Sequence, residues 1–524
     1  MPIATTLDSA HSVSPLLARL ELFRNSDRIA LQDAAGSVSF RGVAERAHGL
    51  ARELCARGLA DKRVGLSSSA DRNWVEAFWA ILLAGGSVVP ISPLHPAPER
   101  AFFLRQSRAE GHLVSASLAA AIPEGPVARL VFEDGRVQTP AASGLDPSGL
   151  APSARRLPEH TALLLYTSGT TGLPKGVPLS HDNIWSCVHT LIRDWEMSPS
   201  DRLIHALPLH HVHGICVALL CAFCSGASTE LLPRYEPAQV LESLGRASVL
   251  MSVPTQHKRL VEHLDALPEA ERRCHEGRLR ALRLITSGSA KLPEQLGRRL
   301  RELSGQYPLE RYGMTEVGIV IGNPLHGLRK PGSCGRPLPG TEIRIVDDHG
   351  REAAPGEPGE IRIRGGSVFA GYDADPAATD TAFEAGFFRT GDTARWTRDG
   401  FVEILGRTSV DIIKSGGYKL SAIEIEEQLR AHAWVVDVAV LGVPDETWGE
   451  RVVAVAVPSA SAQQELELRG EAVGEELREW LKQRVAGYQV PKRIEWWPEL
   501  PRNALGKVQK PELLRLLLMG STSS

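Results

Sequence analysis

The chain has 524 residues, more than one hydrophobic core usually supports, so we expect at least two domains. Its 59 Lys and Arg residues nearly balance 62 Asp and Glu residues, which leaves no basic surplus for binding nucleic acid or an anionic membrane. No apolar run reaches the length of a membrane-spanning helix, the N-terminal residues lack the pattern of a secretory signal, and the terminal STSS is not a peroxisomal signal. We therefore expect a cytoplasmic protein, with a transit peptide as the open alternative.

The first part of the chain alternates between short β-rich segments and longer helical ones. Between residues 30 and 300 the pairs are RVGLSS with NWVEAFWAILLAG, SVVPIS with APERAFFLRQS, SVLMSVP with TQHKRLVEHL, and LRLITSG with PEQLGRRLREL. Such alternation predicts parallel sheets that are covered by helices. After about residue 335, the segments TEIRIVDDHG, GEIRIRG and GFVEILG predict short strands with Gly-rich turns, and so a small β-rich unit.

The pattern changes again after residue 406. SVDIIKSGG, the helix SAIEIEEQLRAH, the strands VVDVAVLGVP and RVVAVAVP, and the helix GEELREWLKQRV predict a compact α+β unit. Within it, residues 459–467 are a low-complexity stretch that we predict to be a surface turn. The fold class is therefore α/β: a large N-terminal domain, residues 1–408, with two parallel-type αβ subdomains and a β-rich subdomain, followed by a small α+β domain, residues 409–524.

The stretch LLLYTSGTTGLPKGVPLSH has the composition of a phosphate-binding loop. The apolar run LLLY predicts a buried strand that ends at a loop rich in hydroxyls, Gly and Lys. It is not a P-loop, because the second Gly counted from Gly169 is replaced by Pro174, and Lys175 is followed by Gly176 instead of Ser or Thr. Ser180 is a good N-cap for a helix that starts after the loop, so we expect the loop itself to be free-standing.

A second cluster is rich in Cys and His but does not predict a metal site. Cys221 and Cys224 have redox spacing, yet they lie in the apolar run GICVALLCAFCSGA, which favours two buried thiols. His210, His211 and His213 lie nearby with Cys216, but neither a fourth ligand nor a second spaced pair follows.

Several further motifs combine Gly, acids and Lys at turn-like positions. They are SGSA at 287–290, YGMTE at 312–316, TGD at 390–392, GR at 406–407, KSGGYK at 414–419 and PRNALGK at 501–507. Together with the loop at 167–175, their order and content resemble the superfamily of adenylate-forming enzymes, which includes acyl-CoA synthetases, peptide-synthetase adenylation domains and beetle luciferase. The likeness extends from about residue 30 to residue 515, and six such motifs in order are far more specific than any one of them.

The resemblance implies a reaction in two steps that uses ATP, Mg²⁺ and coenzyme A. A carboxylate attacks the α-phosphate of ATP and releases pyrophosphate, and a thiol then displaces AMP from the acyl-adenylate. Because anions meet in the first step, cations and dipoles must neutralise their charge. The implied ATP and AMP contacts are Thr167, Ser168, Gly169, Thr170, Thr171, Gly172, Lys175, Gly288, Ser289, Ala290, Tyr312, Gly313, Thr315, Asp392 and Arg407, with Glu316 as the metal ligand.

Three further roles follow from the same resemblance. Lys507 is implied to be the catalytic Lys, alongside Lys175, Thr315 and Glu316, and its ammonium would meet the carboxylate and α-phosphate oxygens. Gly416, Gly417 and Trp448 are implied at the coenzyme A side, which a rotation of the C-terminal domain would bring to the same site. The hinge of that rotation is implied at Ser409, where relatives often carry Asp or Lys.

A narrower likeness concerns the acid. The segments ALPLHHVHGI, GSAKLP, LERYGMTE and NPLHGLRKPG resemble malonyl-CoA synthetases. That likeness implies His211, His213, Ser287 and Arg329 at the acid substrate, with Arg329 able to bind a second carboxylate through two parallel hydrogen bonds. Arg311 is a further candidate for the charge of this pocket. Lys291 and Val317 depart from the commoner residues at their positions and can reshape it.

Alternatives stay open. Another small acid such as oxalate or methylmalonate, or a carrier-protein thiol in place of coenzyme A, is compatible with the same motifs. A luciferase-like oxygenase shares the fold, and a non-enzymatic binding module would have to lack the catalytic cluster. The presence of Lys175, Glu316, Asp392, Arg407 and Lys507 argues against the last of these.

Overall fold

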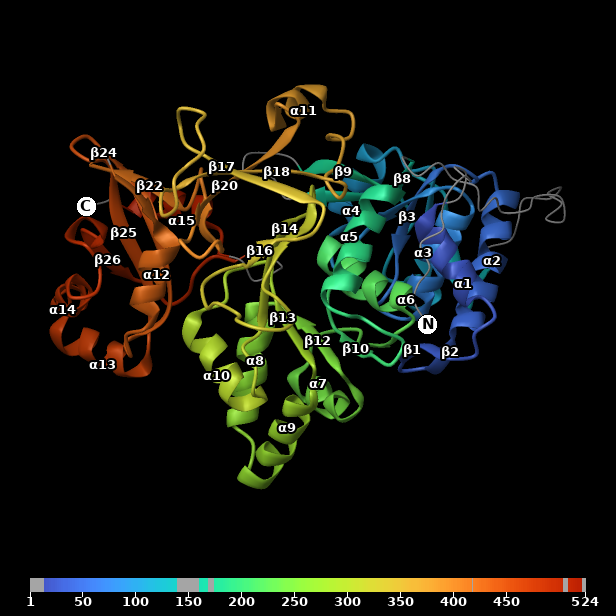
Figure 1. The fold of residues 1–524 in the computed structure, drawn as a ribbon, viewed down its shortest axis with the longest axis horizontal. Helices are drawn as coiled ribbons and strands as arrows, with labels where there is room; N and C mark the ends of the chain where they lie inside the picture. Colours follow the sequence, from blue (N-terminus) through green and yellow to red (C-terminus); the bar gives the residue numbers. More distant parts are fainter. Residues whose placement is uncertain (1–13, 139–159, 168–173, 417, 503–507, 521–524) are drawn as a thin grey trace.

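The computed structural model describes residues 14–138, 160–167, 174–416, 418–502 and 508–520. The described strands form four β-sheets (Figure 1). Within the described ranges, no helix is long and apolar enough to cross a membrane.

The first sheet has seven strands and is mainly parallel. Its order is β7 (Arg136–Val137), β6 (Arg129–Glu133), β5 (Gly111–Ser115), β3 (Arg63–Ser67), β4 (Ser87–Pro90), β8 (Thr161–Thr167) and β9 (Lys175–Ser180). The two edge pairs, β6 with β7 and β8 with β9, are antiparallel. The predicted strand LLLY is therefore part of β8, and β9 returns beside it after the predicted phosphate loop.

The second sheet has nine strands. Its order is β16 (Arg336–Pro337), β15 (Gly318–Gly322), β14 (Leu309–Met314), β13 (Leu284–Ser287), β12 (Val249–Ser252), β10 (Arg202–His205), β11 (Ser228–Leu231), β1 (Ile29–Asp33) and β2 (Gly36–Ser39). The strands from β14 to β1 are parallel, as the alternating sequence pattern predicts.

Helices between and outside these two sheets form the core. One continuous apolar cluster joins both sheets to the helices α1 (Pro15–Phe23), α2 (Phe40–Ala56), α3 (Arg72–Leu83), α5 (His181–Asp194), the π-helix His213–Leu220 and α6 (Cys221–Ser225). Two smaller clusters cover the outer faces, through α4 (Ala97–Gln106) on one sheet and α7 (Pro237–Ser243), α8 (Pro254–Asp265), α9 (Glu269–Ala281) and α10 (Glu294–Ser304) on the other. Cys221 and Cys224 are buried and free, as predicted.

The β-rich unit is an antiparallel sheet of five strands. It contains β17 (Thr341–Val346), β18 (Gly359–Gly365), β19 (Phe383–Glu384), β20 (Phe387–Trp396) and β21 (Val402–Arg407), with α11 (Pro376–Ala382) beside it. In Figure 1 this unit lies between the C-terminal sheet and the strands β8 and β9 of the first αβ unit.

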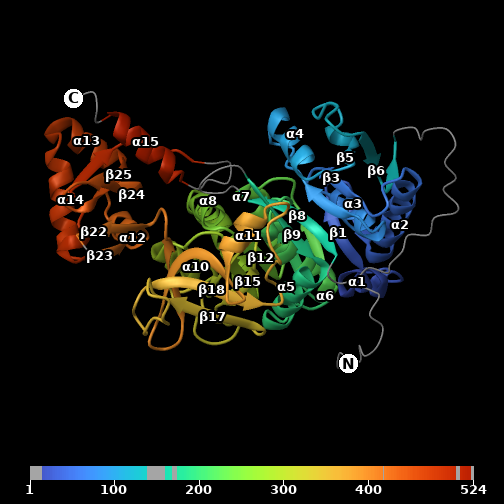
Figure 2. The ribbon, with the colours of Figure 1, turned by 90° about the horizontal axis from the view of Figure 1, so that it is seen from above.

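The C-terminal part has its own sheet and its own core. The sheet contains β22 (Ile412–Ser415), β23 (Tyr418–Ser421), β24 (Val435–Asp445), β25 (Gly449–Pro458) and β26 (Arg493–Trp496). Apolar side chains of α12 (Ala422–Arg430) and α14 (Ala472–Lys482) pack on one face, and those of α15 (Lys510–Gly520) pack on the other. Figure 2 shows this part at one end of the molecule and α1 to α3 at the opposite end.

Two local predictions can be compared with the helices directly. Ser180 caps α5, since its Oγ accepts the Asn183 N–H at 3.0 Å. The predicted surface turn at 459–467 is wrong, because these residues belong to α13 (Ala460–Arg469). Ser459 is its N-cap and accepts the Ala462 N–H at 3.3 Å, so the Ser-rich stretch starts a helix.

Candidate active site

Three of the residues predicted to contact ATP form a hydrogen-bonded group where β14, β20 and β21 meet. The hydroxyl of Tyr312 donates to Asp392 Oδ2 at 2.5 Å, and Arg407 Nε lies 3.0 Å from Asp392 Oδ1. Arg407 Nη1 also donates to the Thr390 carbonyl at 2.7 Å. The β20–β21 register pairs Asp392 directly with Arg407, so the sheet itself brings these two side chains together.

The hairpin of β14 and β15 places the predicted residues Gly313, Thr315 and Glu316. A Cβ on Gly313 would lie 1.9 Å from the carbonyl oxygen of Gly318, so only glycine allows this close pairing. Thr315 and Glu316 lie in the turn that joins the two strands. The turn therefore presents Glu316 beside the Asp392 group at the end of the strand.

Glu316 has the properties of a cation ligand. Its carboxylate is 4 % exposed, Oε1 accepts the Tyr372 hydroxyl at 3.2 Å, and Oε2 has no hydrogen-bond partner among the described residues. Burial raises the pKa of this carboxyl above its ordinary value. In the ranges that the structure covers, no group of three or more His, Cys, Asp or Glu side chains could hold a metal ion alone. One carboxylate together with substrate phosphates is, however, a usual way to bind Mg²⁺.

Lys175 and Thr167 flank the predicted phosphate loop. They are register partners at the ends of β9 and β8, and Thr167 Oγ1 donates to the Lys175 carbonyl at 3.5 Å. The Lys175 ammonium lies over the Tyr372 ring, 4.9 Å from its centre. The predicted residues Ser168, Gly169, Thr170, Thr171 and Gly172 lie outside the described residues, as do Gly417 and Lys507.

Arg311, the further candidate for the charge of the acid pocket, is buried. This side chain is 5 % exposed, and neither Nε nor Nη2 has a hydrogen-bond partner in the described part of the chain. Burial lowers the pKa of its guanidinium to about 10. The guanidinium lies against Gly288, because a Cβ there would be 2.0 Å from Arg311 Nη1. A charged group buried in this way is costly unless a ligand pairs with it.

Other buried polar atoms without partners accompany Arg311. His213 Nδ1 lies 3.2 Å from Ser289 Oγ, while its Nε2 and the Ser287 hydroxyl find no partner among the described residues. Burial, with Arg311 as the next cause, lowers the pKa of His213 well below its ordinary value, so the ring is neutral. Ser289 has a left-handed backbone, φ 67°, and both it and Ala290 are exposed at the end of β13.

The structure places the other two predicted acid-site residues differently. The His211 ring packs at a tilt against His210, with ring centroids 4.2 Å apart, and burial lowers its pKa to about 4. Arg329 has partners for all its nitrogens: Nε donates to the Pro324 carbonyl, Nη1 to the Tyr307 carbonyl and to Gln306 Oε1, and Nη2 to the Leu325 carbonyl, at 2.7 to 3.3 Å. These bonds fix the loop before β16, and the role of Arg329 in binding acid stays a prediction.

Gly416 and Trp448, predicted at the coenzyme A side, are neighbours. The Gly416 N–H donates to the Trp448 carbonyl at 2.9 Å, and a Cβ on Gly416 would lie 3.1 Å from the Trp448 ring. Trp448 is 42 % exposed, and the Lys492 ammonium lies 4.6 Å from the centre of its ring. Ser409, the predicted hinge, is exposed in the turn between β21 and β22.

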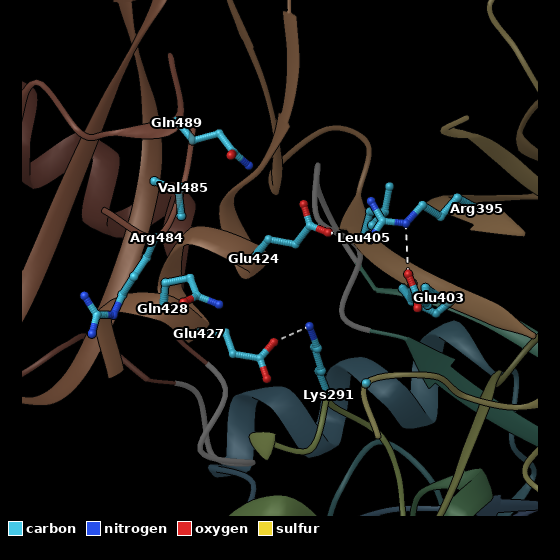
Figure 3. Close-up of a pocket in the computed structure, with 12 residues that line it drawn as sticks. Lys291, Arg395, Glu403, Leu405, Glu424, Glu427, Gln428, Arg484, Val485 and Gln489 are labelled. Carbon is cyan, nitrogen blue, oxygen red and sulfur yellow. Dashed lines mark hydrogen bonds and ion pairs between the residues drawn. The ribbon is translucent and has the colours of Figure 1, made fainter. Parts of the chain in front are cut away.

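A cleft separates the C-terminal sheet and its helices from the rest of the molecule. It has a volume of about 320 Å³ and lies between α12, β21 and the loop before α10 (Figure 3). Two ion pairs cross it: Lys291 with Glu427 at 2.5 Å and Arg395 with Glu424 at 2.9 Å. Figure 3 shows Glu427 reaching from one wall toward Lys291 on the other. Charge pairs therefore connect the two parts in this orientation.

Comparisons with known proteins agree with this arrangement. Two family models match the chain: the AMP-binding enzyme family over residues 21–373, and the AMP-binding enzyme C-terminal domain over residues 424–507. Mitochondrial malonate–CoA ligase ACSF3 of Mus musculus is 37 % identical, over 98 % of this chain and 92 % of its own length. The malonate–CoA ligase of Arabidopsis thaliana is 35 % identical, over 88 % of this chain and 78 % of its own. The crystal structure of ATP-bound MatB from Rhodopseudomonas palustris superposes with a TM-score of 0.85, at 34 % identity, over 96 % of this chain and 99 % of that one.

Proposed function

The chain belongs to the AMP-binding enzyme family, and from this premise we propose that it is a malonate–CoA ligase that forms AMP and pyrophosphate. The malonate–CoA ligases among its relatives support this substrate over other acids. ATP, malonate and coenzyme A are then its small-molecule substrates.

The observation that carries the choice of acid is the buried Arg311, whose Nε and Nη2 have no hydrogen-bond partner within the described ranges. A monocarboxylic acid uses its one carboxylate in the reaction and would leave this guanidinium unpaired. A short dicarboxylic acid brings a second carboxylate, which can accept two hydrogen bonds from Nε and Nη2. Leaving the guanidinium unpaired costs several kcal/mol, on the order of a thousandfold in selectivity. Arg311 is a better candidate than Arg329 to bind the second carboxylate of a short diacid, because the donors of Arg329 already have acceptors.

The nucleotide would bind across the group around Asp392. A carboxylate is suited to accept the ribose hydroxyls, and Arg407 and Tyr312 hold Asp392 in place for this role. Lys175 would move toward the β- and γ-phosphates. Glu316 would hold Mg²⁺ through its free Oε2, and the metal would supply charge neutralisation for the phosphates.

The first half-reaction joins the acid to AMP. One carboxylate oxygen of malonate attacks the α-phosphorus as the bond from this phosphorus to the pyrophosphate oxygen breaks. Negative charge develops at the equatorial oxygens, and Lys507 and Thr315 are the residues that we assign to stabilise it. The neutral His213 can donate or accept one hydrogen bond at the acid without adding charge.

The second half-reaction transfers the acyl group to sulfur. The thiol of coenzyme A attacks the acyl carbon, loses its proton, and AMP leaves with the bonding electron pair. We assign Gly416, Gly417 and Trp448 to the approach of the thiol. Residues 1–408 and 409–524 would then be two domains that turn about Ser409 between the two steps. Since Ser409 is exposed in a turn, little packing opposes a change of backbone angles there.

The direct test is ATP–pyrophosphate exchange with a panel of C2 to C6 mono- and dicarboxylic acids, without coenzyme A. We expect exchange that depends on malonate, and a thioester that forms only after coenzyme A is added. Exchange that follows oxalate or methylmalonate instead would correct the acid, and exchange that follows long-chain fatty acids would refute a diacid pocket. Mass spectrometry after addition of coenzyme A or a carrier protein identifies the acceptor thiol. The cytoplasmic location also stays a prediction.

A further inference from the structure

Tyr372 contacts two of the residues assigned to the triphosphate but belongs to none of the motifs that identify the site. It lies in the segment between β18 and α11, where its N–H donates to Thr379 Oγ1 at 2.9 Å. Its ring packs edge-on against Phe369, whose own N–H donates to the Glu316 carbonyl at 2.8 Å. The side chain is therefore fixed by contacts on both sides.

The two parts of the Tyr372 side chain contact different partners. Its hydroxyl donates to Glu316 Oε1 at 3.2 Å, while Glu316 Oε2 has no partner in the described ranges. The Lys175 ammonium lies over its ring, 4.9 Å from the ring centre. One side chain thus orients an anion that is suited to a metal and a cation that is suited to phosphate.

The next residue anchors this arrangement to the first sheet. The Asp373 N–H donates to the carbonyl of Gly176, the neighbour of Lys175, at 2.8 Å. Its carboxylate accepts two hydrogen bonds from Arg63 on β3, at 2.8 and 2.7 Å, and further ones from Arg108. Two parallel bonds of this kind define an orientation as well as a contact. Tyr372 is therefore held in register with Lys175 by a rigid connection.

We propose that Tyr372 is a positioning residue of the triphosphate site: its hydroxyl occupies Glu316 Oε1 so that Oε2 faces the metal of MgATP, and its ring keeps the Lys175 ammonium in place for the phosphates. This inference rests on the proposed function for the identity of the ligand. It predicts two separable effects, because the hydroxyl serves Glu316 and the ring serves Lys175.

Equilibrium binding of ATP, measured with Mg²⁺ and with EDTA, separates these effects without any turnover. Tyr372→Phe keeps the ring and removes the hydroxyl, so we expect the gain in ATP affinity from Mg²⁺ to fall about tenfold while binding in EDTA is unchanged. Tyr372→Leu removes both, so ATP binding in EDTA should also weaken, about two- to fivefold. Equal losses in EDTA and in Mg²⁺ for Tyr372→Phe would overturn the assignment of the hydroxyl.

Tyr235 offers a matched control whose hydroxyl and ring have partners other than Glu316 and Lys175. Its hydroxyl donates to the Gln256 carbonyl at 2.7 Å, and the Arg259 guanidinium lies 5.4 Å from its ring centre, in the cluster of α7 and α8. Tyr235→Phe and Tyr235→Leu lose the same kinds of contact, and we expect neither to change the Mg²⁺ dependence of ATP binding. If the Tyr235 variants change the Mg²⁺ dependence of ATP binding as much as the Tyr372 variants do, the effect is general destabilisation and the proposal is overturned.

A double-mutant cycle completes the test. With Glu316→Gln, the Mg²⁺ dependence should largely disappear, and adding Tyr372→Phe should have no further effect. Independent, additive losses would show that the two residues do not act together. If the unaltered protein binds MgATP but activates no acid, the proposed function fails and the positioning role can still be judged. If exchange is normal in Tyr372→Phe at every Mg²⁺ concentration and ATP binding is unchanged, the positioning role alone fails.

Discussion

The nucleotide side and the acid side of the candidate site differ in how their buried polar groups are paired. Around Asp392, the side chains of Tyr312 and Arg407 bond to the same carboxylate, so the group is held together by the fold. Around Arg311, the guanidinium, His213 and Ser287 each retain at least one buried polar atom that has no hydrogen-bond partner among the described residues. Paired groups contribute to stability, whereas buried groups without partners cost stability and become favourable only with a ligand. This difference in pairing therefore indicates that the side around Arg311 selects a substrate with a second charge.

The sharpest test compares two arginines. Replacing Arg311 with Met removes a buried charge whose Nε and Nη2 have no acceptor among the described residues, so we expect unchanged or higher thermal stability, with a loss of about a thousandfold in kcat/KM for malonate. Replacing Arg329 with Met instead leaves the carbonyls of Pro324, Tyr307 and Leu325 without donors. That variant should be less stable, with malonate selectivity changed less than about tenfold.

Thermal unfolding and kinetics with malonate and acetate measure both quantities. If Arg329→Met loses malonate selectivity while Arg311→Met keeps it, the acid contact belongs to Arg329, as the sequence comparison first implied, and the pairing argument is wrong.

Glu310 is the neighbour of Arg311 on β14 and is also buried. Unlike Arg311, it can lose its charge, so the two residues show how burial acts on a charge that can be neutralised and on one that cannot. It is 7 % exposed, Oε1 has no partner among the residues described, and burial raises its pKa from 4.5 to about 8. The folded state thus holds this proton more tightly than the unfolded state. Its contribution is most favourable below pH 4.5 and falls as the pH rises to 8.

Glu310→Gln should flatten this dependence. We expect the variant to gain stability relative to the unaltered protein between pH 5 and pH 9, by a few kcal/mol at most, since one pKa unit corresponds to about 1.4 kcal/mol. Denaturant unfolding at several pH values measures the slope. The exposed Glu262→Gln on α8 is the control and should leave the slope unchanged. An equal slope in Glu310→Gln would show that the carboxyl is already ionised at pH 5.

On the paired side, Asp392→Asn should affect stability and ATP binding together. The amide cannot carry the charge that pairs with Arg407, and it accepts the Tyr312 hydroxyl more weakly. We expect the KM for ATP to rise about ten- to hundredfold, the KM for malonate to change little, and the melting temperature to fall. A variant with normal ATP binding but altered acid selectivity would contradict the division into two sides.

The sequence predicts some of these features and not others, for a physical reason. Local patterns predict the strand–helix alternation of both large sheets and the Ser180 cap, because periodicity and capping depend on neighbouring residues. The fold class follows from the alternation of strand and helix segments and agrees with the solved structure of MatB. The pairing of individual donors depends on distant segments: Arg329 meets carbonyls near residue 307, and Tyr372 meets Glu316 across 56 positions.

The roles assigned to the site residues stay predictions, but the structure changes which residue is the main candidate for the acid pocket. From the sequence, Arg311 before YGMTE is only a supporting candidate, but its burial, with Nε and Nη2 unpaired among the described residues, makes it the main one. The sequence signal for Tyr372 is an aromatic residue in the Gly-containing stretch GGSVFAGYD, although nothing local to that stretch indicates its contact with Lys175.

The smallest expected effect concerns the cleft between α12, β21 and the loop before α10. The Lys291–Glu427 pair crosses this cleft at 2.5 Å, with side chains 24 % and 22 % exposed, so it stabilises the present orientation modestly (Figure 3). If the two half-reactions need different orientations, then Lys291→Glu or Glu427→Lys should slow one of them and speed the other. We expect changes of about two- to fivefold, measured as pyrophosphate exchange and as thioester formation from preformed acyl-adenylate.

The combined reversal restores the opposite charges and should restore the original ratio of rates. The Lys62–Glu110 pair, at 3.0 Å on the first αβ unit, is the control, and Lys62→Glu should leave the ratio unchanged. Parallel losses in both half-reactions, or no restoration by the combined reversal, would mean that this pair contributes to folding and not to the choice of orientation.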